Sequence, residues 1–161
     1  MVKNEWSEQD LLVKAQNYCS LAEHCVSEVR EKLYQWGATS AVQDKILSQL
    51  CQAGFIDESR YAAAFVHDKV AFQGWGREKI RMMLLMKHLP SQVVEEAIAG
   101  IDEKVYNQQL FRLIEQKTAS LNSTLSTLNY NKLLRFLAQR GFTTDEIRSI
   151  LQGNISIATT S

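Results

Sequence analysis

Residues 55–90, FIDESRYAAAFVHDKVAFQGWGREKIRMMLLMKHLP, decide the fold of this chain. The first half contains the strong helix formers YAAAF and follows Asp57, whose carboxylate can accept hydrogen bonds from first-turn amides. The glycines of residues 74–76 interrupt the helical pattern before it resumes. The stretch therefore predicts two helices, over 58–72 and 77–88, separated by a tight break.

The apolar pattern of the second of these helices recurs in the chain. Ile80 and Leu84 lie on one helical face, since residues four apart face the same way. In each copy the helix then ends, a short connector follows, and a third helix opens with an apolar pair. The equivalent pairs are Val29/Leu33 and Leu133/Leu137; the helix ends are Gly37, His88 and Gly141; the later pairs are Ile46-Leu47, Ala97-Ile98 and Ile150-Leu151.

This recurrence predicts an all-α protein of three tandem three-helix repeats. The repeats span 8–56, 57–102 and 103–152, and a flexible tail follows at 153–161. Such units stack because each buries its apolar face against a neighbour, so we expect an elongated, curved arrangement. The predicted helices cover 8–19, 21–36, 41–53, 58–72, 77–88, 92–101, 104–120, 126–140 and 144–152.

Capping signals support these helix starts. In a capping box, a Ser or Thr side chain accepts from a first-turn amide, and a Glu or Gln three residues later reaches back. The sequence offers three such pairs, and Gly54 joins Gly37 and Gly141 as a candidate C-terminal cap. The pairs are Ser20 with Glu23, Ser40 with Gln43, and Thr143 with Glu146.

Composition excludes several classes of protein. Basic and acidic residues number 18 each, and 45% of the chain is hydrophobic, as in ordinary globular proteins. No apolar run approaches a membrane span, and the polar start lacks the features of a signal peptide. Three unpatterned cysteines favour a reducing, cytoplasmic setting. We find no HExxH, CxxC or phosphate-binding loop, so we expect no metal, no cofactor and no enzymatic activity.

Two groups of side chains have competing interpretations. Cys19, Cys25 and Cys51 are most simply small buried hydrophobes. Met82, Met83 and Met86 are interpreted as core packing, with an adaptable contact surface as the alternative. For Trp36 and Trp75, which end helices, packing over a repeat junction is favoured over anchoring a partner.

The charge distribution is uneven although the total is zero. Residues 1–56 carry a net −2, 57–102 a net −1, and 103–161 a net +3. Arg77 and Arg81 lie four apart on one side of a helix, and three bases recur in the eighth helix: Lys132, Arg135 and Arg140. A solvated helix face and an anion-binding face both remain open for these bases.

Residues 55–90 resemble the RecX family of bacterial regulators of the RecA recombinase. The family pattern has a Gly-aromatic turn, an acidic pair, Arg-Tyr-Ala, an aromatic-Val pair, a Gly-x-Arg run and a closing turn. Residues 20–37, SLAEHCVSEVREKLYQWG, look like its first unit, and the resemblance extends over 11–152. The matching residues are Gly54-Phe55, Asp57-Glu58, Arg60-Tyr61-Ala62, Phe65-Val66, Gly76-Arg77 with Ile80 and Leu84, and Leu89-Pro90.

The resemblance implies three tandem three-helix units and a non-enzymatic role. Members of the family bind the RecA nucleoprotein filament along its groove and typically restrain it. It assigns structural roles to Asp57, Arg60, Tyr61, Ala62 and Gly76. Seven bases would then face acidic RecA surface or DNA phosphates: Arg77, Lys79, Arg81, Lys87, Lys132, Arg135 and Arg140.

We therefore predict a regulator of RecA in DNA repair, recombination and the SOS response. It binds RecA or its filament and modulates, chiefly inhibits, recombinase activity. The alternative is a sequence-independent DNA-binding helical protein that acts on RecA indirectly. Contact with single- or double-stranded DNA would occur through the filament, and we expect a cytoplasmic monomer without membrane contact. Inhibition and stabilisation of RecA both fit a groove-binding protein.

Overall fold

The structure is a computed structural model that describes residues 5–121 and 127–158. Within these residues every regular element is an α helix, so the predicted all-α class is confirmed. The helices are α1 (Glu8–Leu21), α2 (Val26–Gln35), α3 (Ser40–Gln52), α4 (Glu58–Ala71), α5 (Arg77–Met86), α6 (Ser91–Ala99), α7 (Glu103–Ser120), α8 (Thr127–Gln139) and α9 (Thr144–Ala158).

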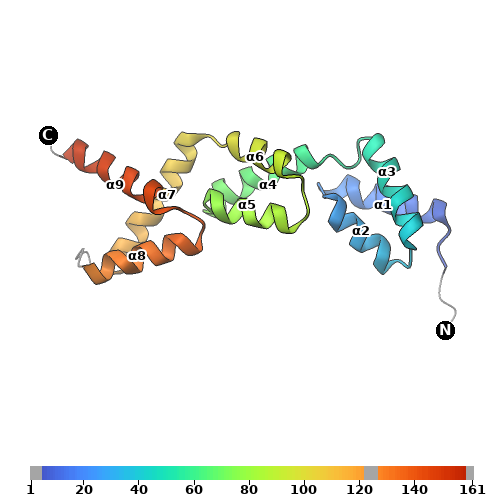
Figure 1. The fold of residues 1–161 in the computed structure, drawn as a ribbon, viewed down its shortest axis with the longest axis horizontal. Coiled ribbons are helices and arrows are strands. Elements are labelled where there is room, and N and C mark those ends of the chain that lie inside the picture. Colours follow the sequence, from blue (N-terminus) through green and yellow to red (C-terminus); the bar gives the residue numbers. More distant parts are fainter. Residues whose placement is uncertain (1–4, 122–126, 159–161) are drawn as a thin grey trace.

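The helices follow one another as three trios along the longest axis of the molecule (Figure 1). The N-terminal trio and the C-terminal trio lie at opposite ends, and α4–α6 lie between them. This elongated order agrees with a stack of helical repeats. The predicted repeat boundaries at 56 and 102 fall between helices and stay a prediction about domain organisation.

The apolar pairs that define the repeat are all core residues. Each lies on the second helix of its trio, α2, α5 or α8, and each side chain is at most 1% exposed: Val29, Leu33, Ile80, Leu84, Leu133 and Leu137. The equivalent face of the second helix is therefore buried in all three trios. The alignment of the three second helices that the sequence predicts is correct.

Each second helix also ends in the same way. Gly37, His88 and Gly141 have φ values of 90°, 62° and 95°, in the left-handed region. The next amide then reaches back to the core leucine, as from Leu89 to the carbonyl of Leu84 at 3.3 Å. This geometry is the Schellman motif, in which glycine is favoured because it has no Cβ. His88 adopts it without that advantage.

Buried side chains form two separate clusters. The first includes Leu33 and is drawn from residues 11–56. The second runs continuously through the middle and C-terminal trios and includes Ile80, Leu110 and Leu137. Cys25, the residue before α2, belongs to this second cluster and is fully buried. The N-terminal trio thus inserts one residue into the core of its neighbour.

Several predicted helix ends need correction. The second helix begins at Val26 rather than at 21, so Ser20 and Glu23 form no capping box. Ser20 lies inside α1, where its hydroxyl donates to the carbonyl of Gln16. Thr39, not Ser40, caps α3 by accepting from the amide of Val42. The capping box of Thr143 and Glu146 is present, with both hydrogen bonds formed.

The last helix and two cysteines also differ from expectation. The ninth helix was predicted to end at 152, but α9 continues to Ala158 and so covers the first part of the predicted tail; residues 159–161 lie outside the described residues. Of the three cysteines, only Cys25 is buried, whereas Cys19 is half-buried and Cys51 is exposed. Periodicity alone does not separate a helix face that meets a neighbouring helix from one that meets water.

Leu84 and Leu85 provide a direct test of the α5 register. Leu84 is 0% exposed and Leu85 is 43% exposed, although they are neighbours in sequence. Leu84→Ala is expected to cost about 2–5 kcal/mol, because it removes buried apolar contacts and leaves a cavity. Leu85→Ala is the matched control and is expected to change stability by less than about 0.5 kcal/mol. Equal shifts in the urea midpoint would contradict this register.

Candidate partner-binding surface

The junction between the middle and C-terminal trios is made by backbone atoms. The amide of Gly76 donates to the carbonyl of Arg140 at 2.7 Å, and the amide of Glu78 donates to the carbonyl of Gly141 at 3.1 Å. The start of α5 thus donates to the carbonyls of the turn that follows α8. A Cβ added at Gly76 would overlap the backbone of Gly141, so the two glycines permit this approach.

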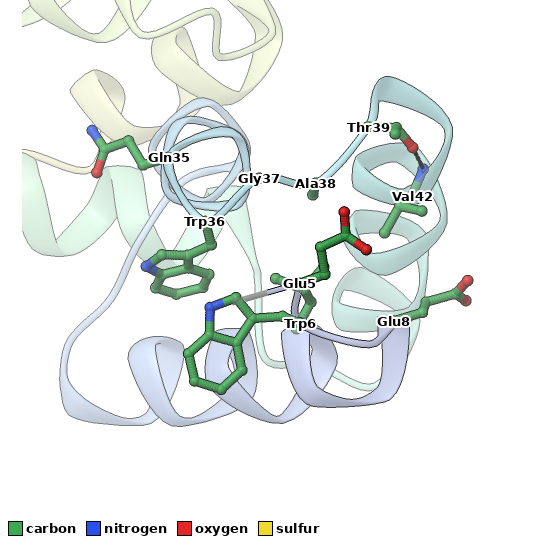
Figure 2. A pocket seen from close by; sticks show the side chains of 10 residues that line it. Glu5, Trp6, Glu8, Gln35, Trp36, Gly37, Ala38, Thr39 and Val42 are labelled. Carbon is green, nitrogen blue, oxygen red and sulfur yellow. Dashed lines mark hydrogen bonds between the residues drawn. The ribbon is translucent and has the colours of Figure 1, made fainter. Parts of the chain in front are cut away.

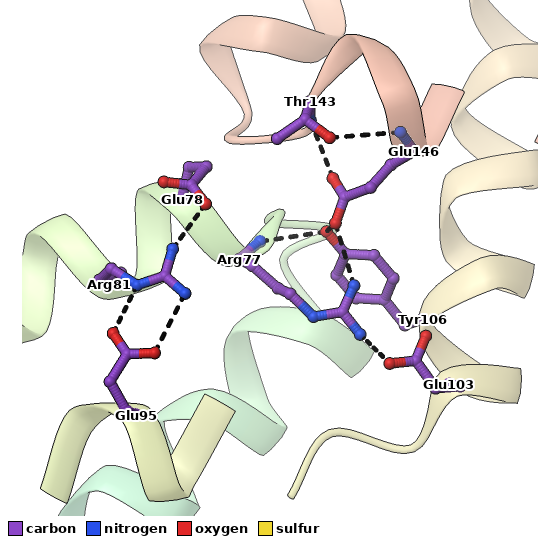
Figure 3. A network of polar contacts seen from close by, with 8 residues as sticks. All are labelled: Arg77, Glu78, Arg81, Glu95, Glu103, Tyr106, Thr143 and Glu146. Carbon is purple, nitrogen blue, oxygen red and sulfur yellow. Dashed lines mark hydrogen bonds and ion pairs between the residues drawn. The ribbon is translucent and has the colours of Figure 1, made fainter. Parts of the chain in front are cut away.

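Arg77 locks the same junction through its side chain (Figure 3). Its guanidinium donates to Glu146 Oε1 at 3.0 Å, pairs with Glu103, and lies 4.0 Å from the ring centroid of Tyr106. The Tyr106 hydroxyl donates to Glu146 Oε1 and accepts the backbone amide of Arg77. Arg77, with a side chain only 20% exposed, joins α5 to α7 and α9.

Glu146 has two roles, of which the sequence predicts only the first. Its Oε2 accepts the amide of Thr143 at 2.8 Å, as the capping box predicts. Its Oε1 accepts from Arg77 and Tyr106, which come from other helices. The capping-box spacing identifies the first role, but no local pattern in the sequence identifies the second.

Arg81 is also paired within the protein (Figure 3). Its guanidinium donates to Glu95 Oε1 at 2.7 Å and to Glu78 Oε1 at 2.5 Å. The hydrogen bonds to these two carboxylates raise the pKa of Arg81 above its ordinary value. Arg81 therefore ties α5 to α6, inside the middle trio.

The junction between the N-terminal and middle trios centres on Glu28 of α2. Its Oε1 accepts the Tyr61 hydroxyl at 2.7 Å and Lys87 Nζ at 2.9 Å, and its Oε2 lies 2.7 Å from His24 Nδ1. Burial alone would raise the pKa of Glu28, but the hydrogen bonds from Tyr61, His24 and Lys87 outweigh it and hold that pKa below its ordinary value. The pKa of Tyr61 is raised by burial and by the Glu28 carboxylate.

The remaining motif residues lie around this junction. Asp57 accepts the amide of Arg60 at 3.0 Å and caps α4. The Arg60 guanidinium pairs with Glu23 and donates to the carbonyl of Gly54 at 3.1 Å, which links α4 to the N-terminal trio. Ala62 is 0% exposed and belongs to the core.

The predicted basic residues do not form one solvated face. Arg77, Arg81 and Lys87 are paired to carboxylates, so a solvated helix face, one of the two interpretations left open, does not describe Arg77 and Arg81. Lys79 Nζ lies 4.2 Å from the ring centroid of Trp75. Arg140 donates to the carbonyl of Gln73 at 3.2 Å, across the second junction. Helical spacing places bases on one side but does not show which carboxylates a neighbouring helix brings to them.

Lys132 and Arg135 differ from these residues. Both are exposed, and neither side chain has a hydrogen bond or ion pair among the described residues. They line a hollow of about 220 Å³ together with Lys117, Phe136 and Gln139, here called the basic hollow. Lys117 Nζ lies 5.0 Å from the ring centroid of Phe136. The basic hollow thus combines uncompensated positive charge with an aromatic ring.

An apolar strip lies on α5. Met82, Leu85 and Met86 are 55%, 43% and 66% exposed, and their spacing places them on one side of the helix. The interpretation of the methionines as core residues is therefore wrong for Met82 and Met86. Flexible methionine side chains on a surface suit contact with another protein.

Other kinds of site find little support in the described part of the chain. Among residues 5–121 and 127–158 no three His, Cys, Asp or Glu side chains come together in a way suited to a metal ion. None of the described helices is long and apolar enough to cross a membrane.

The glycine junction predicts a steric effect that can be isolated. Gly76 has φ −84°, which any residue adopts, so only the close approach of Gly141 requires glycine there. Gly76→Ala is expected to destabilise the fold by about 1–3 kcal/mol through overpacking. Gly153→Ala, where an added Cβ meets nothing within 4 Å, is the control and is expected to be neutral or stabilising by up to ~1 kcal/mol. Thermal denaturation of both variants tests this difference.

The lowered pKa of Glu28 predicts a pH dependence of stability. A carboxylate with a depressed pKa in the folded state stabilises the fold above its unfolded pKa of about 4.3, and this contribution is lost as the pH falls. Glu28→Gln is therefore expected to lower the melting temperature at neutral pH, with the difference from wild type narrowing toward about pH 3. Glu31→Gln, at an exposed position of α2, is the control. A difference that is constant with pH would contradict a charged Glu28.

Comparisons with known proteins agree with this architecture. Residues 57–98 match the family model for the second three-helix domain of RecX. The structure also overlays on the crystal structure of RecX from Lactobacillus salivarius, with a TM-score of 0.81. The overlay covers 91% of this chain and 95% of that one, and the two sequences are 22% identical. That likeness shows the shared fold.

Sequence comparison supplies the relationship. Regulatory protein RecX of Clostridium botulinum strain Alaska E43 is 33% identical over 78% of this chain, which spans 59% of that relative's length. Regulatory protein RecX of Pseudomonas savastanoi pv. phaseolicola is 32% identical over 81% of this chain and 83% of its own length. With this identity over most of both chains, and with the shared fold, the chain belongs to the RecX family of regulatory proteins.

Proposed function

We propose that this protein binds the RecA nucleoprotein filament and inhibits its recombinase activity. The observation that carries this proposal is the 32% identity to a regulatory protein RecX over 83% of that relative's length. The resemblance in residues 55–90 points to the same partner. An inhibitory protein of this kind needs no catalytic centre, because occupying the filament surface is enough.

The shape supports binding along an extended partner. Three trios in a row present a long surface (Figure 1), and many modest contacts on one long surface add up in affinity. Met82, Leu85 and Met86 expose apolar area for a protein partner. The basic hollow supplies positive charge for an acidic protein surface or for nearby phosphates.

We propose fewer residues for the interface than the seven bases that the resemblance implies, because several of those bases are paired within this chain. Arg77, Arg81 and Lys87 already hold carboxylates of this chain, so using them for a partner would first require breaking those pairs. Lys117 and Arg135 carry no ion pair among the described residues. We therefore assign the contact with the filament to the basic hollow and to the apolar strip of α5.

One observation favours direct DNA binding as the alternative. Phe136 lies in the basic hollow, with Lys117 Nζ and the Arg140 guanidinium carbon each 5.0 Å from its ring centroid. A ring beside cations is the arrangement on which single-stranded nucleic acids stack. The protein would then compete with RecA for DNA rather than bind the filament.

A charge reversal tests the proposed interface. Lys117→Glu with Arg135→Glu is expected to raise the concentration needed to inhibit RecA-driven ATP hydrolysis on single-stranded DNA by roughly tenfold, equivalent to ~1.4 kcal/mol of binding. Lys104→Glu with Arg148→Glu is the control: it changes the charge equally, at exposed positions outside the hollow. Circular dichroism verifies that both variants are folded.

The outcomes separate the two functions. Equal inhibition by both variants would remove the basic hollow from the interface, and no effect of wild type on RecA would remove the proposed function. Binding to single-stranded DNA without RecA distinguishes the alternative. If DNA binding explains inhibition, affinity falls steeply with salt, by about 0.7 log units per log of salt for each neutralised phosphate, and excess DNA relieves inhibition.

A further inference from the structure

The two junctions between the trios are built differently. At the second junction, the amides of Gly76 and Glu78 donate to backbone carbonyls, and one buried cluster runs through both trios. At the first junction, the described residues form no backbone–backbone hydrogen bond between the N-terminal and middle trios. The N-terminal trio also has a separate buried cluster. The first junction is therefore held mainly by contacts that involve side chains.

The N-terminal trio packs mainly on itself. Its cluster, which includes Leu33 and Leu47, lies within residues 11–56. Thr39 caps α3 from inside the trio, and the hollow of about 600 Å³ beside this cap is lined by the trio's own residues (Figure 2). The start of α2 is the exception, because the side chain of its N-cap residue, Cys25, makes no capping hydrogen bond. This helix start relies on the neighbouring trio.

Glu28, in the first turn of α2, favours the closed junction. Its carboxylate accepts from Tyr61 and Lys87 of the middle trio and contacts His24 of its own trio. These hydrogen bonds hold its pKa below the ordinary value, so the charged form is stabilised when the trios are together. Separating the trios would remove the contacts with Tyr61 and Lys87.

Glu58, in the first turn of α4, acts in the opposite direction. The backbone amide of Val26, the first residue of α2, hydrogen-bonds to its carboxylate, but burial outweighs this bond and raises the pKa of Glu58. Its Oε2 is buried and has no hydrogen-bond partner among the described residues, as is also true of Glu23 Oε2. A charged carboxylate is better solvated in water than here, so the charge on Glu58 favours separation of the trios.

Cys25 reports on this junction. It belongs to the N-terminal trio but is fully buried in the cluster of the other two trios. Ala15, also 0% exposed, is buried in the N-terminal trio's own cluster. Separation of the trios would therefore expose Cys25 and leave Ala15 covered, whereas unfolding would expose both.

We propose that the junction between the N-terminal and middle trios is a hinge that opens without unfolding either trio, with Glu28 holding it closed and Glu58 opposing closure. The balance between these two carboxylates sets how often it opens. The second junction stays fixed, because a continuous core and backbone hydrogen bonds cross it. The elongated molecule in Figure 1 therefore bends at one place. No partner is needed, so the hinge is independent of the proposed function.

The reaction of Cys25 with the thiol reagent DTNB measures the opening, because a buried thiol reacts only when it becomes exposed. Cys19→Ser with Cys51→Ser leaves Cys25 as the single thiol. Ala15→Cys, added to this background, places a second thiol in the N-terminal trio's own core. Cys25 is expected to react faster than this second thiol by roughly tenfold or more, since opening the hinge costs less than unfolding the trio.

Two variants that each remove one negative charge are expected to change the Cys25 rate in opposite directions. Glu28→Gln is expected to raise it by roughly tenfold, because charge-assisted hydrogen bonds across the junction are lost. Glu58→Gln is expected to lower it by roughly threefold, because the amide keeps an acceptor for Val26 and removes a buried charge. Glu31→Gln, at an exposed position of α2, is the matched control and is expected to leave the rate unchanged.

Opposite directions exclude a trivial explanation. Removing a negative charge near the thiol would increase its thiolate fraction in both variants and so accelerate both reactions. A change of the same sign in Glu28→Gln and Glu58→Gln would overturn the proposal, as would equal rates for Cys25 and the Ala15→Cys thiol. Circular dichroism verifies native helix content. If Glu28→Gln does not fold, Glu58→Gln still decides: slower reaction of Cys25 supports the hinge, and an unchanged or faster reaction contradicts it.

Discussion

The docking of one helix start onto the end of the next trio's second helix is the constraint on which the rest of this structure depends. At the junction of α5 and α8, amides at the start of α5 donate to carbonyls of the turn that follows α8, so the contact satisfies donors that a helix leaves free at its N-terminus. Because the partial charges at those ends are opposite, the alignment is also electrostatically favourable. The approach requires that Gly76 and Gly141 carry no side chain.

The charged residues at the junctions serve geometry more than stability. Arg77 and Glu146 are each about a fifth exposed, so much of their attraction offsets the cost of leaving water. The pair instead fixes the relative orientation of the helices, because Arg77 contacts both α7 and α9 from α5. Glu28 does the same for α2 against α4 and α5. Arg77, Arg81 and Lys87, the bases near the family motif, are therefore paired within the protein.

The sequence predicted the fold well where the information is local. Leu33, Leu84 and Leu137 were assigned to the core from spacing alone, and Gly37 and Gly141 have the left-handed geometry of the predicted C-terminal caps, whereas the same geometry at His88 was not predicted. The sequence-based prediction was wrong where the position of a side chain depends on contact with a helix that is distant in the sequence. The start of α2 was predicted too early because Ser20 looks like a cap. In the structure α2 begins only after Cys25, whose side chain is buried in the core of the neighbouring trio.

The candidate site was harder to predict for the same reason. Arg77 and Lys132 look alike in sequence, as bases near the start of a second helix. Arg77 meets Glu146 and Glu103 because another trio follows it, and the equivalent turn of α8 has no following trio in the described chain. The difference lies in position along the stack and not in local pattern. Only the three-dimensional arrangement shows it.

The order of the trios also explains how a neutral chain presents charge. Residues 1–56 carry a net −2, residues 57–102 a net −1 and residues 103–161 a net +3, so the charges of opposite sign lie at the two ends of the molecule. An elongated molecule with separated charge is oriented by the field of a charged partner before contact is made. Its C-terminal end would lead toward acidic surface or phosphate, and its N-terminal end would be held away.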